Sequence, residues 1–210
     1  MLAKLSLEEF IDRLAAGTPT PGGGSAAALA GCLAASLVQM VCDLTIGREA
    51  YRDHEPALVV IREKAQKERR ELLALVDRDA RAYDAVVAAL RLPRATEAEK
   101  AARQDALSKA SLLATETPLA TAEACATVLE MTVELAAKGN RNAASDVGTA
   151  ATLALAALLG AIQNVRINLG GIADAGRAAA AAERARALEG QGERLKMACF
   201  AALASGAGRR

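Results

Sequence analysis

Apolar residues recur along this chain at the three- and four-residue spacing of amphipathic helices, and no stretch alternates with period two. The pattern predicts helices over about 7–16, 25–46, 55–90, 96–138, 140–168 and 174–204. Ser6 with Glu9 and Thr96 with Glu99 form capping boxes at two of the starts, and Pro118 predicts a kink or a break within the fourth helix. The expected fold class is all-α, an up-and-down helical bundle with long central helices, in a single domain over 1–210.

The second predicted helix is the element around which we expect the bundle to form. Three glycines, Gly22, Gly23 and Gly24, follow two prolines and predict a flexible, non-helical loop, and a helix that is apolar on every side begins at Ser25. Such a helix is expected at the buried centre of the fold. Backbone N–H groups at its start suit a carboxylate or a phosphate, although a tight entry turn explains the glycines equally well.

Charge and composition exclude several classes of function. Lys and Arg total 26 against 25 Asp and Glu, and the chain has two Phe, two Tyr and no Trp, so nucleic acid is not an expected partner. The four cysteines are widely spaced and the single histidine, His54, has no second ligand at a suitable spacing, so we expect no metal site. Free thiols are typical of a reducing compartment, which predicts a cytoplasmic protein.

Two alanine-rich stretches, 26–42 and 147–162, imitate membrane spans. Both are shorter than the ~20 apolar residues that a bilayer requires, and alanine anchors a helix poorly in a membrane. We therefore expect core helices of a bundle and no membrane contact. A single bundle of this size cannot bury every side of two nearly apolar helices. This predicts a homodimer whose interface uses the small-residue faces.

Asp79 lies in the middle of an apolar stripe of the third helix, whereas Asp77 and Asp84 are expected on the opposite, solvent-exposed side. A carboxylate on an apolar face is either a structural group bonded to an arginine or to a helix end, or part of a cleft. In the fifth helix Asp146, Asn164 and Asn168 share one face with small residues between them. This face predicts either a groove for a long ligand or hydrogen bonds between helices.

Five motifs in order are distinctive, namely P-G-G-G-S-A-A-A at 21–28, L-T-I-G-R at 44–48, D-x-D-A-x-A-Y at 77–83, L-P-R at 92–94 and G-N-x-N-x-x-S-D at 139–146. The N-V-x-I-N of 164–168 belongs to the same pattern. Together they resemble the formimidoyltetrahydrofolate cyclodeaminase/methenyltetrahydrofolate cyclohydrolase family. The resemblance runs from about Ser6 to beyond Asn168.

The resemblance implies an all-α homodimeric domain that acts on a tetrahydrofolate derivative, with or without a polyglutamate tail, and that needs no further cofactor. It implies first the cyclisation of 5-formimidoyl-tetrahydrofolate to 5,10-methenyltetrahydrofolate with release of ammonia. The alternative is the cyclohydrolase reaction, in which water opens the methenyl compound to formyltetrahydrofolate. A noncatalytic helical folate-binding dimer competes with both. Bifunctional members of the family carry a transferase domain ahead of this one, and we expect this chain to act as a stand-alone domain.

The resemblance also implies roles for individual residues. Asp79, the second Asp of D-x-D-A, matches the catalytic aspartate of the family, and the helical-face argument isolates the same residue. The glycine loop and the 140–146 segment would hold the folate or its glutamate tail, and Arg48 would pair with a carboxylate. The implied substrate-binding residues are Gly22, Gly23, Gly24, Ser25, Arg48, Tyr83, Asn140, Ser145, Asp146, Asn164 and Asn168.

Overall fold

The computed structural model describes residues 1–207, and this part of the chain is helical without any strand. The helices are α1 (Leu7–Ala15), α2 (Gly23–Asp43), α3 (Glu55–Leu90), α4 (Glu97–Lys138), α5 (Ala144–Asn168) and α6 (Ala175–Ala207). Short 3-10 turns, η1 (Leu2–Lys4), η2 (Glu49–His54), η3 (Arg141–Ala143) and η4 (Leu169–Gly171), join or precede them. The predicted all-α bundle with long helices is confirmed, and the four cysteines are free and buried as expected.

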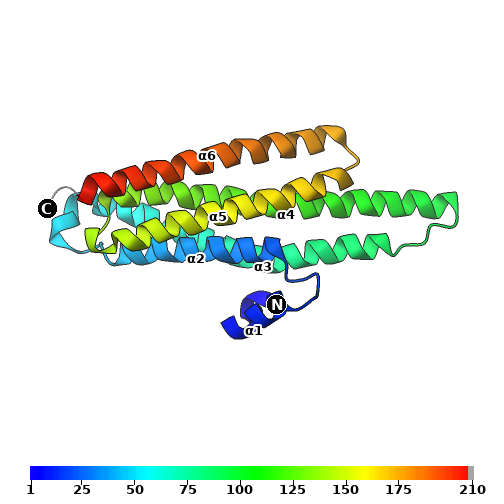
Figure 1. The fold of residues 1–210 in the computed structure, drawn as a ribbon, viewed down its shortest axis with the longest axis horizontal. Coiled ribbons are helices and arrows are strands. Elements are labelled where there is room, and N and C mark those ends of the chain that lie inside the picture. The colour runs from blue at the N-terminus through cyan, green and yellow to red at the C-terminus, as the bar shows by residue number, and fades with distance from the viewer. Residues whose placement is uncertain (208–210) are drawn as a thin grey trace.

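Helix α4 lies at the centre of the bundle because it is the only described helix that packs against α2, α3, α5 and α6. Around it, α2 lies between α3 and α5, and α5 lies between α2 and α6 (Figure 1). The paired ends of α3 and α4 project beyond the start of α2 (Figure 1). Residues at the start of α2 therefore face the middle of α3 and the end of α5.

Two predictions about α2 are wrong. The helix begins at Gly23, with Gly22 as an extended N-cap, so two of the three glycines are helical. The N–H groups in the first turn of a helix have no intrahelical acceptor, whichever residue is present. Glycine is therefore tolerated in this turn. Helix α2 is also not the centre of the fold, because one of its faces is open, with Leu33 51% and Met40 38% exposed.

Pro118 does not break α4, which is one helix from Glu97 to Lys138. Proline has no N–H group and cannot donate to the carbonyl of Ala114, four residues earlier. The side chain of Asn168 replaces that donor, since its Nδ2 lies 2.7 Å from the Ala114 oxygen. Of the predicted kink or break, the break is therefore wrong, and a contact from α5 satisfies the carbonyl that Pro118 leaves free.

The N-terminal segment also differs from expectation. The capping box of Ser6 and Glu9 starts α1 as predicted, but only Phe10 of this helix is buried and Leu7 is 71% exposed. Helix α1 lies beside the bundle rather than in it (Figure 1). Asp77, expected in solvent, is only 7% exposed and accepts a hydrogen bond from the backbone N–H of Leu2, so it fastens the N-terminus to α3.

Candidate functional site

A pocket of about 270 Å³ lies where the start of α2 meets the middle of α3 and the end of α5. The segment before α2 and its first turn form one wall, α3 forms a second, and α5 with one residue of α4 closes the third. The lining residues are Pro19, Thr20, Gly22, Gly23, Gly24, Asp79, Ala82, Tyr83, Val86, Ala114, Asn164, Ile167 and Asn168. Seven of the predicted site residues therefore line one cavity, and Ser25 touches its carboxylate.

Asp79 is the charged group of this pocket. The hydroxyl of Ser25 lies 2.9 Å from Asp79 Oδ2 and 3.1 Å from the carbonyl oxygen of Val76. Burial raises the pKa of the Asp79 carboxyl, and the hydrogen bonds from the Ser25 side chain and backbone N–H oppose that rise. No ion pair to Asp79 occurs among the described residues, so an arginine partner within one chain is excluded. The carboxylate does bond the start of α2 through Ser25, so the helix-end contact and the cleft coexist at Asp79. The carboxylate can accept a proton and can stabilise a cation.

Gly24 allows α2 to approach Asp79 this closely. A Cβ atom at position 24 would lie 2.0 Å from Asp79 Oδ1 and 2.5 Å from its Cγ. The requirement is one of space and not of backbone conformation, since the only positive φ angle in the described chain is at Gly47. The absence of a side chain at position 24 therefore leaves the space that the Asp79 carboxylate occupies.

Asn164 and Asn168 line the opposite wall of the pocket. Nδ2 of Asn164 donates to the carbonyl oxygen of Gly160 at 2.9 Å, and Nδ2 of Asn168 donates to that of Ala114. Because their amide nitrogens are held by backbone carbonyls, both side chains have their oxygens left for a ligand. The Asn168 side chain bonds α5 to α4 and also lines the pocket, so both alternatives that the sequence left open apply to this residue.

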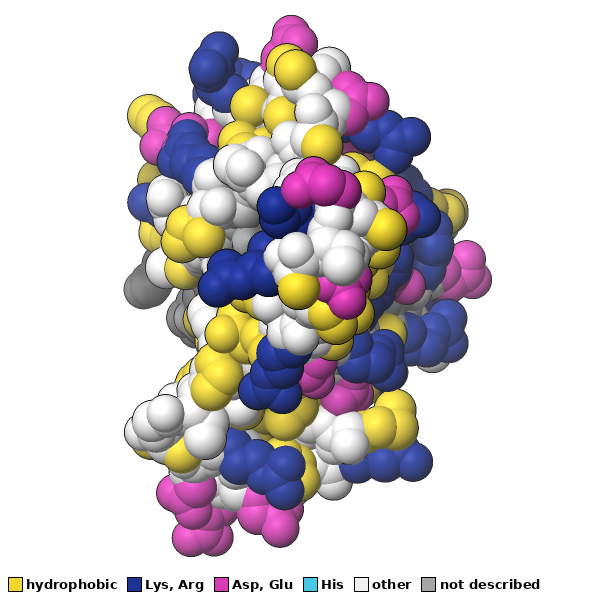
Figure 2. Space-filling model, turned by 90° about the vertical axis from the view of Figure 1, so that its right-hand side faces the viewer, with side chains coloured by type: hydrophobic (Ala, Val, Ile, Leu, Met, Phe, Trp, Pro, Cys, Tyr) yellow, Lys and Arg dark blue, Asp and Glu magenta, His cyan; other side chains and the backbone are white. Residues whose placement is uncertain are grey.

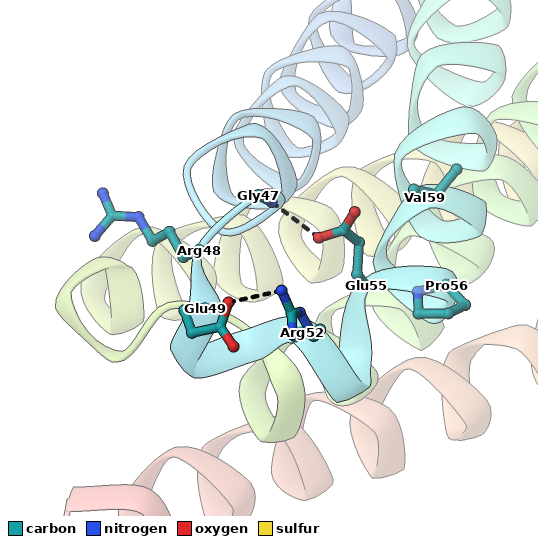
Figure 3. Close-up of a pocket in the computed structure, with 7 residues that line it drawn as sticks. All are labelled: Gly47, Arg48, Glu49, Arg52, Glu55, Pro56 and Val59. Carbon is teal, nitrogen blue, oxygen red and sulfur yellow. Dashed lines mark hydrogen bonds and ion pairs between the residues drawn. The ribbon is translucent and has the colours of Figure 1, made fainter.

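Four of the predicted substrate-binding residues lie at the opposite end of the bundle. Helix α2 separates Gly24 from the turn before Arg48 by about 30 Å. Arg48 borders a second hollow of about 580 Å³, where Glu49 pairs with Arg52 at 3.0 Å and the Gly47 N–H donates to Glu55 at 3.0 Å. Figure 3 shows the Arg48 guanidinium pointing away from these residues.

Asn140, Ser145 and Asp146 lie at that same end, around the start of α5. Asn140 is buried, and its Nδ2 donates to the carbonyl of Leu44 at 3.3 Å while its Oδ1 accepts from the N–H of Asn142 at 3.1 Å. Its amide therefore joins the end of α2 to the start of α5. Ser145 is exposed and Asp146 is partly exposed. The structure does not bring these residues to Asp79 within one chain.

Ile167 is a pocket residue that the sequence reasoning missed. It is 80% exposed and lines the pocket beside the two asparagines. The signal was present in the N-V-x-I-N motif, which places an apolar side chain between Asn164 and Asn168. Only the structure shows that this isoleucine lies at the mouth of the cavity and is not buried with the rest of the helix.

The surface carries no large field of one sign at the projecting end of the bundle. Figure 2 looks at the end where α3 turns into α4, and Lys and Arg side chains alternate there with Asp and Glu. This agrees with the formal net charge of +1. This end of the molecule therefore offers no long-range attraction for a ligand of one sign.

Residues 6–187 match the formiminotransferase-cyclodeaminase family. A methenyltetrahydrofolate cyclohydrolase from Methylorubrum extorquens is 43% identical over 190 residues, which are 90% of each protein. A formimidoyltransferase-cyclodeaminase from Rattus norvegicus is 34% identical over 82% of this chain, which spans only 32% of that longer protein. The crystal structure of a formiminotetrahydrofolate cyclodeaminase from Thermotoga maritima superposes with a TM-score of 0.86 at 31% identity and covers 98% of both chains. The chain thus belongs to the formiminotransferase-cyclodeaminase family and is an enzyme of folate one-carbon metabolism.

Proposed function

We propose that this protein is a methenyltetrahydrofolate cyclohydrolase. The observation that carries the proposal is the 43% identity to the Methylorubrum extorquens cyclohydrolase over 90% of both proteins, a match in length as well as in sequence. The pocket supports it because a half-buried carboxylate without a cationic partner suits a substrate whose reacting carbon is cationic. The cyclohydrolase reaction replaces the cyclodeaminase reaction as the preferred one of the two that the sequence implies.

In the proposed reaction the oxygen of water bonds to the carbon that bridges the two folate nitrogens. One carbon–nitrogen bond then breaks, that nitrogen gains a proton, and a second proton is released with formyltetrahydrofolate. Asp79 acts as the base for the attacking water and returns a proton to the departing nitrogen. Its negative charge also stabilises the substrate cation. The raised pKa of the Asp79 carboxyl makes it a better proton acceptor than an exposed aspartate.

The second candidate is the cyclodeaminase reaction, which the likeness to the Thermotoga maritima enzyme favours. One folate nitrogen attacks the formimidoyl carbon held on the other, and ammonia leaves. The same carbon ends between the same two nitrogens, so Asp79 serves either reaction as base and acid. A noncatalytic folate-binding role is the least economical interpretation, because a scaffold gains nothing from an unpaired carboxylate in its pocket.

We also propose that the working form is a homodimer, and that no cofactor other than the folate substrate takes part. The uncharged outer sides of α2 and α5 support the first point, since exposed apolar surface of this extent marks an interface. The second follows from the chemistry. Water or amine addition to an activated one-carbon unit needs proton transfers and no redox step.

The test of the reaction is an incubation of purified protein with 5,10-methenyltetrahydrofolate and, separately, with 5-formimidoyl-tetrahydrofolate. Loss of the methenyl absorbance in the first tube faster than in a protein-free control supports the cyclohydrolase. Appearance of that absorbance with stoichiometric ammonia in the second tube would favour the cyclodeaminase instead. A protein that changes neither rate is not a catalyst of either reaction.

The test of the residue is Asp79→Asn. We expect turnover to fall by about two orders of magnitude or more with little change in folate affinity, because volume is kept while charge and basicity are removed. Stability should hold or rise at neutral pH. A carboxyl whose pKa is raised in the folded state stabilises the fold only when protonated, and this contribution is lost as the pH rises through that pKa.

The matched control is Asp84→Asn, five residues along α3 and exposed. It should be nearly silent. Asp77→Asn is unsuitable as a control because Asp77 is buried and holds the N-terminus. Equal activity of the Asp79 and Asp84 variants would remove Asp79 from the mechanism, and unfolding of the Asp79 variant would assign it to stability.

A further inference from the structure

Ser25 contacts the Asp79 carboxylate from inside the fold and not from the pocket. The residue is fully buried, with 0% of its surface exposed, and it does not belong to the residues that line the cavity. A substrate in the pocket of one chain therefore has no access to the Ser25 hydroxyl. Any effect of Ser25 on the reaction must pass through Asp79.

The start of α2 holds Asp79 in place through the backbone of Ser25. Ser25 is the third residue of α2, and its N–H group has no acceptor within the helix. The side chain of an N-cap residue often supplies that acceptor, but Gly22 has no side chain and no such bond forms. The Asp79 carboxylate, which comes from α3, accepts from this N–H instead. The carboxylate is thus fixed next to the Ser25 hydroxyl.

The Ser25 hydroxyl has two acceptors and one proton. Its Oγ lies 2.9 Å from Asp79 Oδ2 and 3.1 Å from the Val76 carbonyl oxygen, so both are within hydrogen-bond distance. The proton can be donated to either one, while Oγ can itself accept a bond. When Asp79 is ionised, the stronger bond is the one to the charged carboxylate. When Oδ2 carries a proton, Asp79 becomes the donor to Oγ, and the hydroxyl proton turns to Val76.

This arrangement gives Asp79 a partner in both of its protonation states. A lysine or an arginine would favour the ionised carboxylate alone, and no ion pair to Asp79 occurs in the described part of the chain. A backbone N–H is likewise only a donor. A group that acts as base and then as acid passes through both states in one turnover, and a partner that stabilises only one of them slows it. A hydroxyl avoids this because it can donate or accept.

We propose that Ser25 is a positioning residue for proton transfer by Asp79. The Ser25 hydroxyl turns between Asp79 Oδ2 and the Val76 carbonyl as the carboxyl gains and loses the proton of the reaction. Asp79 takes a proton from the attacking water and gives one to the departing nitrogen, and Ser25 keeps its own proton throughout. No covalent bond of Ser25 breaks, and only the direction of its hydrogen bonds changes. The inference rests on the proposed function for its reaction.

The test compares Ser25→Ala with Ser25→Cys. Alanine removes the hydroxyl, whereas cysteine keeps a side chain of the same shape with a weak S–H donor and a weak sulfur acceptor. We expect kcat to fall by about 10-fold or more in both variants while KM changes by less than about twofold, because Ser25 does not line the pocket. A Ser25→Cys protein with the wild-type kcat would show that the residue only fills space. A raised KM with unchanged kcat would make Ser25 a substrate-binding residue, and either result overturns the proposal.

A second comparison shows whether the effect passes through Asp79. In an Asp79→Asn background, Ser25→Ala should lower the remaining kcat by less than about twofold, since the group that Ser25 serves is already lost. Equal losses in the two backgrounds would contradict the proposal. Ser36→Ala is the matched control, because the Ser36 hydroxyl lies on the same helix and donates to the Cys32 carbonyl at 2.8 Å. This variant should leave both kcat and KM unchanged.

The contact between the two side chains is tested without any substrate. NMR titration of the Asp79 carboxyl carbon should show a higher pKa in Ser25→Ala than in the wild type, because the hydroxyl bonds the charged carboxylate more strongly than the neutral acid. Identical titration curves would refute the role of Ser25. A wild type that leaves both folates unchanged refutes the proposed function instead, and the titration still decides whether Ser25 acts on Asp79.

Discussion

Gly24→Ala is the substitution for which the structure gives the most definite expectation. The new Cβ would lie 2.0 Å from Asp79 Oδ1, where contacts below 3.4 Å are already tight, so the carboxylate must move by more than about 1 Å. A displacement of this size at a reacting group costs about two orders of magnitude in rate. We therefore expect kcat/KM to fall at least 100-fold. Overpacking should also cost about 1–3 kcal/mol of unfolding free energy.

The adjacent glycine provides the control. In Gly23→Ala the new Cβ would lie 3.6 Å from Asn164 Nδ2, an ordinary van der Waals contact. Both substitutions bring a similar gain in helix propensity, since both positions are in the first turn of α2. The comparison of the two thus isolates the collision with Asp79. Both variants are compared by steady-state assays and by urea unfolding. A folded Gly24→Ala protein that kept more than about a third of wild-type activity would refute the reasoning.

Two further predictions concern the hydrogen bonds around the pocket. Ser25→Ala removes a bond that lowers the pKa of the Asp79 carboxyl, so the acid limb of the kcat/KM profile should move to higher pH, and an unmoved limb would show that Asp79 does not titrate in it. Asn168→Ala should cost about 1–3 kcal/mol of unfolding free energy, because the Ala114 carbonyl loses its donor. The same change in a Pro118→Ala background should cost less, since the restored backbone N–H at position 118 can donate to Ala114. A double-mutant cycle without coupling would contradict this account.

The helices could be predicted from sequence because their signals are local. The capping boxes at Ser6 and Thr96 mark the starts of α1 and α4, and Pro93 follows closely after the end of α3 at Leu90. Asp79 could be singled out for a similar reason, since its apolar neighbours recur on one face of a single helix. The sequence-based site and the observed pocket therefore share their central residue.

The remaining differences arise from contacts between distant segments. Asp77 appeared exposed on the helical wheel of α3, and nothing near it in sequence shows that Leu2 donates to it. The role of Gly24 depends on a carboxylate from another helix, and the carbonyl that Pro118 leaves free in α4 finds its donor in Asn168 of α5. The apolar residues on every side of α2 predicted a buried central helix, and the sequence could not show that one side of this helix lies open at the surface of a single chain.

The bond between Asn168 and Ala114 makes the middle of the longest helix depend on the last turn of another. Helix α4 cannot complete its own hydrogen bonding at Pro118, so an opening of the end of α5 leaves a carbonyl of α4 without a donor. We therefore expect the two segments to open together, which native-state hydrogen exchange would resolve. Because Asn168 also lines the pocket, we expect a bound ligand that holds this side chain to slow amide exchange in the centre of the bundle as well as around the pocket.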